Sequence, residues 1–240
     1  MRLQSVIRAI YPPQCVACDA QTEDDFGLCA ACWRETQFIG GLVCDTCGAP
    51  LPGENNGEIA QCDDCLTIAR PWNRGRAVLV YAGVGRRLVL GLKHGDRTDL
   101  ARPAAQWMAQ KIADWPLSDT VIVPVPLHWV RVARRRYNQS ALLAQEIGKV
   151  MKLPVCADAL LRPKRTTALV GHSRDARFAE LSGAIVPNPK RADQISGKAV
   201  ILIDDVMTSG ATLAASAEAA KAAGATNVSI VTLARVTKDV

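Results

Sequence analysis

The stretch "VILIDDVMTSGATL", residues 200–213, joins an apolar run to two adjacent acids and then to a turn of small residues. The run 200–203 predicts a buried strand, and the alanine-rich segment 211–223 predicts a helix. A strand that enters a helix through a loop of Thr, Ser and Gly directs backbone N–H groups and hydroxyls toward the positive end of the helix dipole. Such a loop is suited to binding one phosphate group.

The two acids, Asp204 and Asp205, lie directly before this loop. Carboxylates beside a site for one phosphate suggest a sugar whose hydroxyls donate to both acids while its 5-phosphate lies in the loop. The lysine of a nucleoside-triphosphate loop and the GxGxxG of a dinucleotide site are missing from the stretch, which argues against ATP and NAD. The alternative is an ordinary strand-to-helix turn with solvated acids.

The chain from residue 76 onward alternates between two kinds of segment. Runs rich in Val and Ile alternate with candidate helices, the last of which ends at Gly224. The expected strands are 77–82, 120–126, 199–204 and 228–236, and the expected helices are 100–114, 139–151 and 211–223. This order predicts an α/β domain over 76–240, with a mostly parallel sheet and helices on both faces. Ligands bind such sheets at the carboxyl ends of strands, here after residues 126 and 203.

Eight of the nine cysteines lie in the first 66 residues, and all eight come in CxxC pairs. The pairs are Cys15 with Cys18, Cys29 with Cys32, Cys44 with Cys47, and Cys62 with Cys65. Four such pairs supply two structural four-cysteine zinc sites, which predicts a small zinc-ribbon module over residues 1–70. The spacing favours one zinc ion bound by the first two pairs and a second bound by the last two pairs. An interleaved arrangement of the pairs is the alternative. Iron in place of zinc, and redox chemistry at one pair, are further alternatives.

Composition and charge limit the class of protein and its partners. The chain has 240 residues, 49% of them hydrophobic, and contains no run of roughly 18 to 20 apolar residues that would span a membrane. We therefore expect a cytoplasmic protein, in which the cysteines stay reduced. Residues 1–66 carry a net charge of −7, which leaves +13 for the rest of a chain whose total is +6. The acidic module should repel nucleic acid and contact protein instead, either a partner or its own basic neighbour.

The quoted stretch resembles the signature that binds 5-phosphoribosyl 1-pyrophosphate (PRPP) in type I phosphoribosyltransferases. Three further features extend the likeness over nearly the whole chain: the paired cysteines, "GLKHGDRTDLA" at 91–101, and "PVPLHWVRVARRRYNQSALLAQEI" at 124–147. Together they resemble the ComF family of competence-associated proteins. The resemblance implies a double zinc ribbon followed by a phosphoribosyltransferase-like domain, a substrate of PRPP with Mg²⁺, and a link to the uptake of transforming DNA.

The same resemblance implies roles for individual residues. Asp204 and Asp205 would be the catalytic acids that bind the ribose hydroxyls. The 5-phosphate would be bound by the loop that contains Val206, Met207, Thr208, Ser209, Gly210, Ala211 and Thr212. The pyrophosphate would be bound by the segment that contains Pro124, Val125 and Pro126 and by the arginines Arg131, Arg135 and Arg136. Guanidinium groups suit a leaving group with several negative charges, although this arginine run also fits a solvated basic surface.

A stretch at 162–185 departs from the family pattern. Relatives carry a glutamine and an asparagine where this chain has Leu169 and Glu180. The stretch corresponds to the catalytic loop region, so the departure bears on turnover more than on PRPP binding. His172 in this stretch is a candidate acid or base.

A function without chemistry is the alternative. Residues 131–177 hold 11 Lys and Arg against 3 Asp and Glu. The positive electrostatic potential of this segment could bind single-stranded DNA. Trp129 and Tyr137 could stack on bases there. In that case the chain would be a nucleic-acid adaptor or a PRPP sensor, and a third hypothesis is a protein-docking role for the acidic zinc module.

Overall fold

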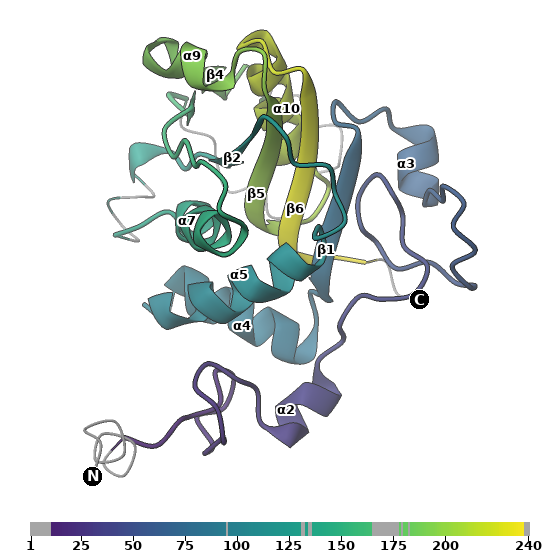
Figure 1. Ribbon diagram of the computed structural model, residues 1–240, viewed down its shortest axis with the longest axis vertical. Helices are drawn as coiled ribbons and strands as arrows, with labels where there is room; N and C mark the ends of the chain where they lie inside the picture. The colour runs from purple at the N-terminus through teal and green to yellow at the C-terminus, as the bar shows by residue number, and fades with distance from the viewer. Residues whose placement is uncertain are drawn as a thin grey trace.

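A four-stranded parallel sheet lies at the centre of the computed structural model, which describes residues 11–94, 96–130, 133, 136–164, 178, 180–181 and 183–237 (Figure 1). The strand order is β1-β6-β5-β2, and each neighbouring pair is parallel. The strands are β1 (Arg74–Val80), β6 (Asn227–Arg235), β5 (Ala199–Met207) and β2 (Thr120–Pro124). Two short strands, β3 (Leu160–Leu161) and β4 (Val186–Pro187), form a separate antiparallel pair. The expected parallel α/β sheet is confirmed.

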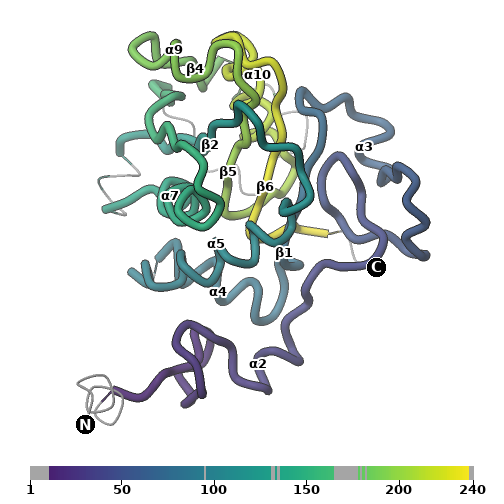
Figure 2. Tube along the Cα trace, viewed as in Figure 1, coloured from purple at the N-terminus to yellow at the C-terminus, as the bar shows by residue number. Residues whose placement is uncertain are grey.

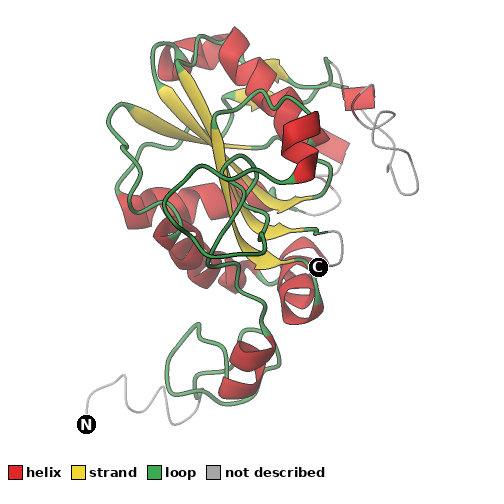
Figure 3. Ribbon diagram, turned by 90° about the vertical axis from the view of Figure 1, so that its right-hand side faces the viewer, coloured by secondary structure: helices red, strands yellow, loops and turns green. Residues whose placement is uncertain are grey.

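Helices cover both faces of the sheet, as Figure 3 shows. On one face lie α4 (Gly83–His94), α5 (Ala101–Gln110) and α7 (Gln139–Met151), and on the other lies α10 (Ala211–Ala222). The shorter helices are α2 (Ala30–Glu35), α3 (Asp63–Thr67), η1 (Thr98–Leu100), η2 (Pro189–Arg191) and α9 (Ala192–Ile195). In the described part of the chain, no helix combines the length and the apolar character that crossing a bilayer requires.

The alternation of side chains along β5 explains why its sequence is aliphatic without interruption. Val200 and Leu202 belong to the core that contains α10. Ile201 and Ile203 belong to the core that contains α4, α5 and α7. Successive residues of a strand point to opposite faces, so a strand covered on both sides buries all of them.

Several elements differ from the sequence-based expectation. Strand β1 spans 74–80 instead of 77–82, β2 ends at residue 124 instead of 126, and α5 ends at residue 110 instead of 114. Helix α4 was not predicted, because its three glycines obscure an apolar face that buries Leu88, Val89 and Leu92. Strand β5 continues past the expected end at residue 204, because its pairing with β6 runs on to Met207 opposite Arg235. Both acids therefore lie within the strand.

The two cysteine clusters of the zinc module lie against different parts of the sheet domain, which begins with β1. Figure 2 shows the first cluster's segment below α4 and the second cluster's segment beside β1. Cys15 and Cys32 are buried with residues of α4 and α5. Cys44 and Cys47 are buried in the core on the opposite face, with residues of α10. The sheet domain thus separates the two clusters.

Acids of the zinc module form ion pairs with arginines of the basic sheet domain. The pairs are Asp45 with Arg76 at 3.0 Å, Asp19 with Arg97 at 3.3 Å, and Glu35 with Arg87 at 3.8 Å. Solvent-accessible pairs of this kind contribute little stability each. They do agree with the expectation that the acidic module contacts its own basic neighbour.

Candidate functional site

Two helices hold the acid pair at the carboxyl end of β5. Asp204 Oδ1 accepts hydrogen bonds from the Ser140 hydroxyl of α7 at 2.8 Å and from the Asp205 amide at 2.9 Å. Asp205 Oδ1 lies 3.1 Å from the Lys93 ammonium of α4, and the Asp205 side chain is only 8% exposed. Both carboxylates are therefore fixed before any ligand arrives.

Asp204 has a pKa close to neutral pH. Burial, reinforced by the charge of Asp205, raises the pKa of Asp204 from 3.8 to about 7, although Lys93 and Ser140 oppose the rise. Near pH 7 the Asp204 carboxyl can therefore accept or donate a hydrogen bond. Such a group suits a neutral sugar hydroxyl, which can do both.

This raised pKa gives a prediction about stability. The folded chain keeps the Asp204 proton at pH values where the unfolded chain has lost it, so the carboxyl costs the fold stability as pH rises from about 4 to about 7. Asp204→Asn keeps an oxygen acceptor for Ser140 and removes the charge. We expect it to stabilise the fold by about 2 kcal/mol at pH 8 and by progressively less toward pH 5.5. Urea unfolding across this range checks it, and a difference that does not change with pH would contradict it.

The loop after β5 leads into the N-terminus of α10. Gly210 is the N-cap of the 12-residue helix α10 and has a φ of 84°, in the left-handed region that favours glycine. The amides at the start of a helix have no acceptor within the helix, so they are available to a ligand. Thr208 is exposed and Ser209 is partly exposed, with the Ser209 hydroxyl accepting from the Ala211 amide at 3.4 Å. Of the other predicted loop residues, Met207 and Ala211 are buried, while Val206 and Thr212 are partly buried.

The segment predicted to bind pyrophosphate lies beside the acids. Pro124 is paired with Ile203 in the sheet, and the Val125 amide donates to the Ile203 carbonyl at 2.9 Å. The Asn138 side chain, at the start of α7, donates to the Val125 carbonyl at 3.0 Å. Pro124, Val125 and Pro126 are buried, so this segment would contact a ligand mainly through its backbone.

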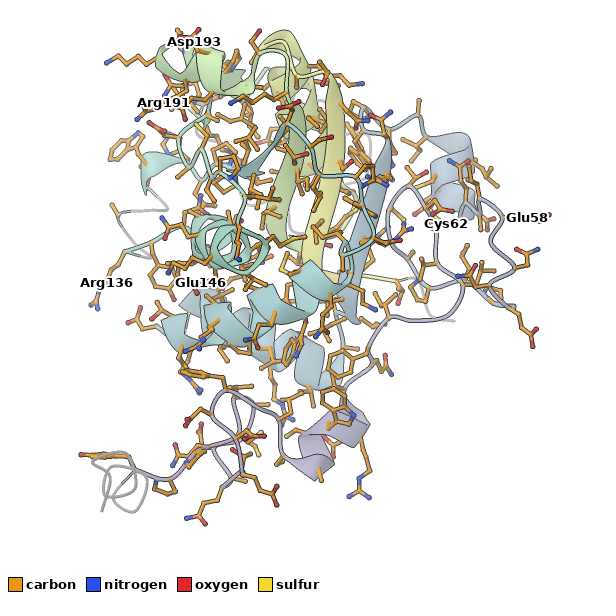
Figure 4. All side chains as sticks on the ribbon, in the orientation of Figure 1. Glu58, Cys62, Arg136, Glu146, Arg191 and Asp193 are labelled. Carbon is orange, nitrogen blue, oxygen red and sulfur yellow. The ribbon has the colours of Figure 1, made fainter. Side chains whose placement is uncertain are left out.

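The predicted arginines are only partly placed. Arg131 and Arg135 lie outside the described residues. Arg136 projects outward beyond α7 in Figure 4 and forms an exposed ion pair with Asp96 at 3.5 Å. Leu169 and His172 also lie outside the described residues, whereas Glu180 is described and partly buried.

The aromatic residues of the adaptor hypothesis have different environments. The Tyr137 hydroxyl donates to the Leu92 carbonyl at 2.8 Å, so this side chain connects the segment before α7 to α4. Trp129 is 70% exposed, which leaves its ring accessible.

The eight cysteines of the module form two groups of four thiols. The groups are Cys15, Cys18, Cys29 and Cys32, and Cys44, Cys47, Cys62 and Cys65, with the ligand atoms of each group within 4.8 Å of one another. The sequential pairing is confirmed. Four converging sulfurs form the donor set of structural zinc, and the Cys29 amide also donates to the Cys15 sulfur at 3.2 Å. These residues therefore fit zinc.

Sequence reasoning missed several residues around the acids and the loop. Lys93 and Ser140 lie in the stretches 91–101 and 124–147 quoted above, but neither was assigned a role. Arg235 is only 4% exposed, and its guanidinium donates to the Thr208 carbonyl at 2.7 Å. Arg70 donates to the Ser209 carbonyl at 2.8 Å. A charged residue inside the apolar run 228–236 was the available signal for Arg235, because arginine is rarely buried without a partner.

Comparison with known sequences gives two family matches and a set of relatives. Residues 6–66 match a double zinc ribbon domain, and residues 98–239 match a phosphoribosyl transferase domain. The chain is 29% identical over 217 residues to DNA utilization protein YhgH of Escherichia coli K12, which covers 88% of this chain and 91% of that protein. It is 27% identical over 193 residues to Competence protein F of Haemophilus influenzae, covering 78% and 81% respectively.

Among solved structures, two partial matches have low sequence identity. A glutamine PRPP amidotransferase from B. subtilis, complexed with ADP and GMP, is 16% identical with a TM-score of 0.40. The match covers 60% of this chain and 30% of that chain. A purine phosphoribosyltransferase from Pyrococcus horikoshii is 17% identical with a TM-score of 0.31, covering 57% of this chain and 84% of that one.

Proposed function

We propose that the chain binds PRPP with Mg²⁺ at the end of β5. It belongs to the phosphoribosyltransferase domain family, and its double zinc ribbon is consistent with the ComF proteins. The observation that carries the proposal is the position of the acid pair. Asp204 and Asp205 lie at the carboxyl end of a central parallel strand, and the strand leads directly into the loop before α10. One ligand with adjacent hydroxyls and a terminal phosphate would engage both features.

Each part of the site has a role in this proposal. The two carboxylates accept hydrogen bonds from the ribose hydroxyls, and the loop 207–212 binds the 5-phosphate through its amides and hydroxyls. The segment 124–126 and the arginines after it would bind the pyrophosphate. Mg²⁺ would accompany the ligand and neutralise part of the pyrophosphate charge. The Lys93 ammonium, 3.1 Å from Asp205, balances the charge of that carboxylate.

Transfer of the phosphoribosyl group is the catalytic form of the proposal. A nitrogen nucleophile would form a bond to ribose C1 while the bond from C1 to the pyrophosphate oxygen breaks and pyrophosphate leaves. The fixed carboxylates would hold the ribose ring as positive charge develops on it. The names of the relatives, a competence protein and DNA utilization proteins, support a role for this chemistry, or for PRPP recognition alone, in competence or in DNA utilization.

Calorimetric titration of the full chain tests the proposal. With Mg²⁺ present, we expect PRPP to bind at least about tenfold more tightly than either ribose 5-phosphate or pyrophosphate, because it engages both halves of the site. Lack of PRPP binding would overturn the proposal. Pyrophosphate release from bound PRPP, tested with a panel of bases, separates the enzyme from a sensor.

A nucleic-acid adaptor is the second candidate function, and the exposed ring of Trp129 favours it. This residue lies two positions before the basic segment 131–177. The adaptor would bind single-stranded oligonucleotides with an affinity that falls as salt rises, and Trp129→Ala would weaken that binding because base stacking is lost. Binding without salt dependence would argue against this function.

A further inference from the structure

We propose that the second zinc site (Cys44, Cys47, Cys62 and Cys65) holds the phosphate loop in its binding shape through Arg235 and Arg70, an inference that rests on the proposed function. In this view the two arginines are positioning residues, which act on the ligand through the loop backbone. The first zinc site (Cys15, Cys18, Cys29 and Cys32) packs on the opposite face of the sheet and has no such role.

Arg235 connects the loop to the zinc site directly. Its Nη1 donates to the carbonyls of Met207 at 3.2 Å and Thr208 at 2.7 Å. Its Nη2 lies 4.0 Å from the Cys47 sulfur. A zinc ion with four thiolates carries about two negative charges, so a buried guanidinium beside it gains the counter-charge that its burial requires. The zinc site thus stabilises the cation that holds the loop.

Arg70 provides a second connection. Its Nη1 donates to the Ser209 carbonyl at 2.8 Å, and its guanidinium carbon lies 5.5 Å from the centre of the Trp72 ring. The buried Trp72 donates through its indole N–H to the carbonyl of Thr46 at 2.7 Å. Thr46 directly precedes Cys47, so this chain of contacts also ends at the second zinc site.

The contacts of the two arginines determine where the loop amides point. The carbonyls that they hold belong to three successive peptide units, 207–208, 208–209 and 209–210. In a planar trans peptide the N–H points away from the C=O. Carbonyls turned toward the arginines therefore turn the amides of Thr208, Ser209 and Gly210 the other way, as a concave set of donors suited to an anion.

Two cysteine substitutions make a matched pair for testing this inference. Cys29 and Cys62 are both partly buried, and each is the N-cap of a short helix, α2 or α3. In hydrogen exchange of the full chain, we expect Cys62→Ser to speed amide exchange in the segment 206–212 by about tenfold or more. This factor corresponds to the free energy of one lost hydrogen bond to a charged group. Cys29→Ser should leave this segment within about twofold of the unmodified chain. Equal exchange of the segment in the two variants would overturn the inference.

Arg70→Met separates loop positioning from general unfolding. Methionine can still pack on Trp72, and all eight cysteines remain. We expect faster exchange in 206–212, again by about tenfold, with no change in α7 and no loss of zinc. An unchanged loop in this variant would also overturn the inference, even if Cys62→Ser unfolds the whole chain.

Zinc affinity gives a readout that a purely structural role would not change. If the second site and the loop are coupled, bound PRPP must tighten zinc binding at that site by the same factor by which zinc tightens PRPP binding. Competition with a chelator, with and without PRPP, measures this factor in Cys29→Ser, which retains only the second site intact. A factor of one would contradict the coupling. If PRPP fails to bind, the proposed function fails, while the exchange experiments still decide whether zinc positions the loop.

Discussion

Replacing Asp204 and Asp205 together by asparagine is expected to weaken PRPP binding by about 100-fold or more. A hydrogen bond to a charged group contributes about 1.5–3 kcal/mol, and the two carboxylates would accept at least one each from the ribose hydroxyls. In the unmodified chain the Lys93 ammonium lies 3.1 Å from a carboxylate oxygen of Asp205, and the substitution removes this charge partner. Calorimetry with Mg²⁺ measures the loss directly.

The control for this prediction removes the same charge elsewhere. Asp193 and Glu218 are both exposed, on α9 and α10, so Asp193→Asn with Glu218→Gln changes the net charge equally without touching the site. We expect this control to bind PRPP within about twofold of the unmodified chain. If the folded Asp204 and Asp205 variant binds as tightly as the control, the acids are not part of the ligand site.

Local sequence patterns were sufficient to predict the zinc sites and the strand with its acids. The CxxC spacing brings two thiols to one turn, and the continuous aliphatic run before Asp204 is typical of a strand covered on both faces. In both cases the determining residues are neighbours in the chain. The sequential grouping of the cysteines and the parallel sheet followed from these patterns.

Contacts between distant residues could not be predicted in the same way. Ser140 reaches Asp204 from 64 positions away, and Arg70 reaches Ser209 from 139 positions away. Such pairs depend on how α7 and the second zinc site pack on the sheet, which no local pattern encodes. Lys93 was missed for a related reason, since the glycines of α4 concealed the helix that carries it to Asp205.

Gly48→Ala is expected to lower the free energy of unfolding by about 4 kcal/mol, because the second zinc site packs directly on the backbone of β1. A Cβ at this position would lie 2.4 Å from the Ala77 amide nitrogen and 2.7 Å from the Arg76 carbonyl carbon. Atoms of a hydrogen-bonded strand cannot move aside as the end of a flexible side chain can. The residue also has a φ of 70°, which disfavours any residue with a Cβ.

Gly41→Ala isolates the packing contribution to this effect. Gly41 has a φ of 65°, close to that of Gly48, but a Cβ there would meet no atom within 4 Å. Its substitution should therefore cost only the backbone strain, about 1 kcal/mol. Urea unfolding of both variants with zinc bound gives the difference between them. Since the strain is common to both, a difference of about 3 kcal/mol measures the close contact between the second zinc site and β1. An equal decrease in the free energy of unfolding of the two variants would mean that the second zinc site is loosely packed on the sheet. A loosely packed site could not hold the phosphate loop through Arg235.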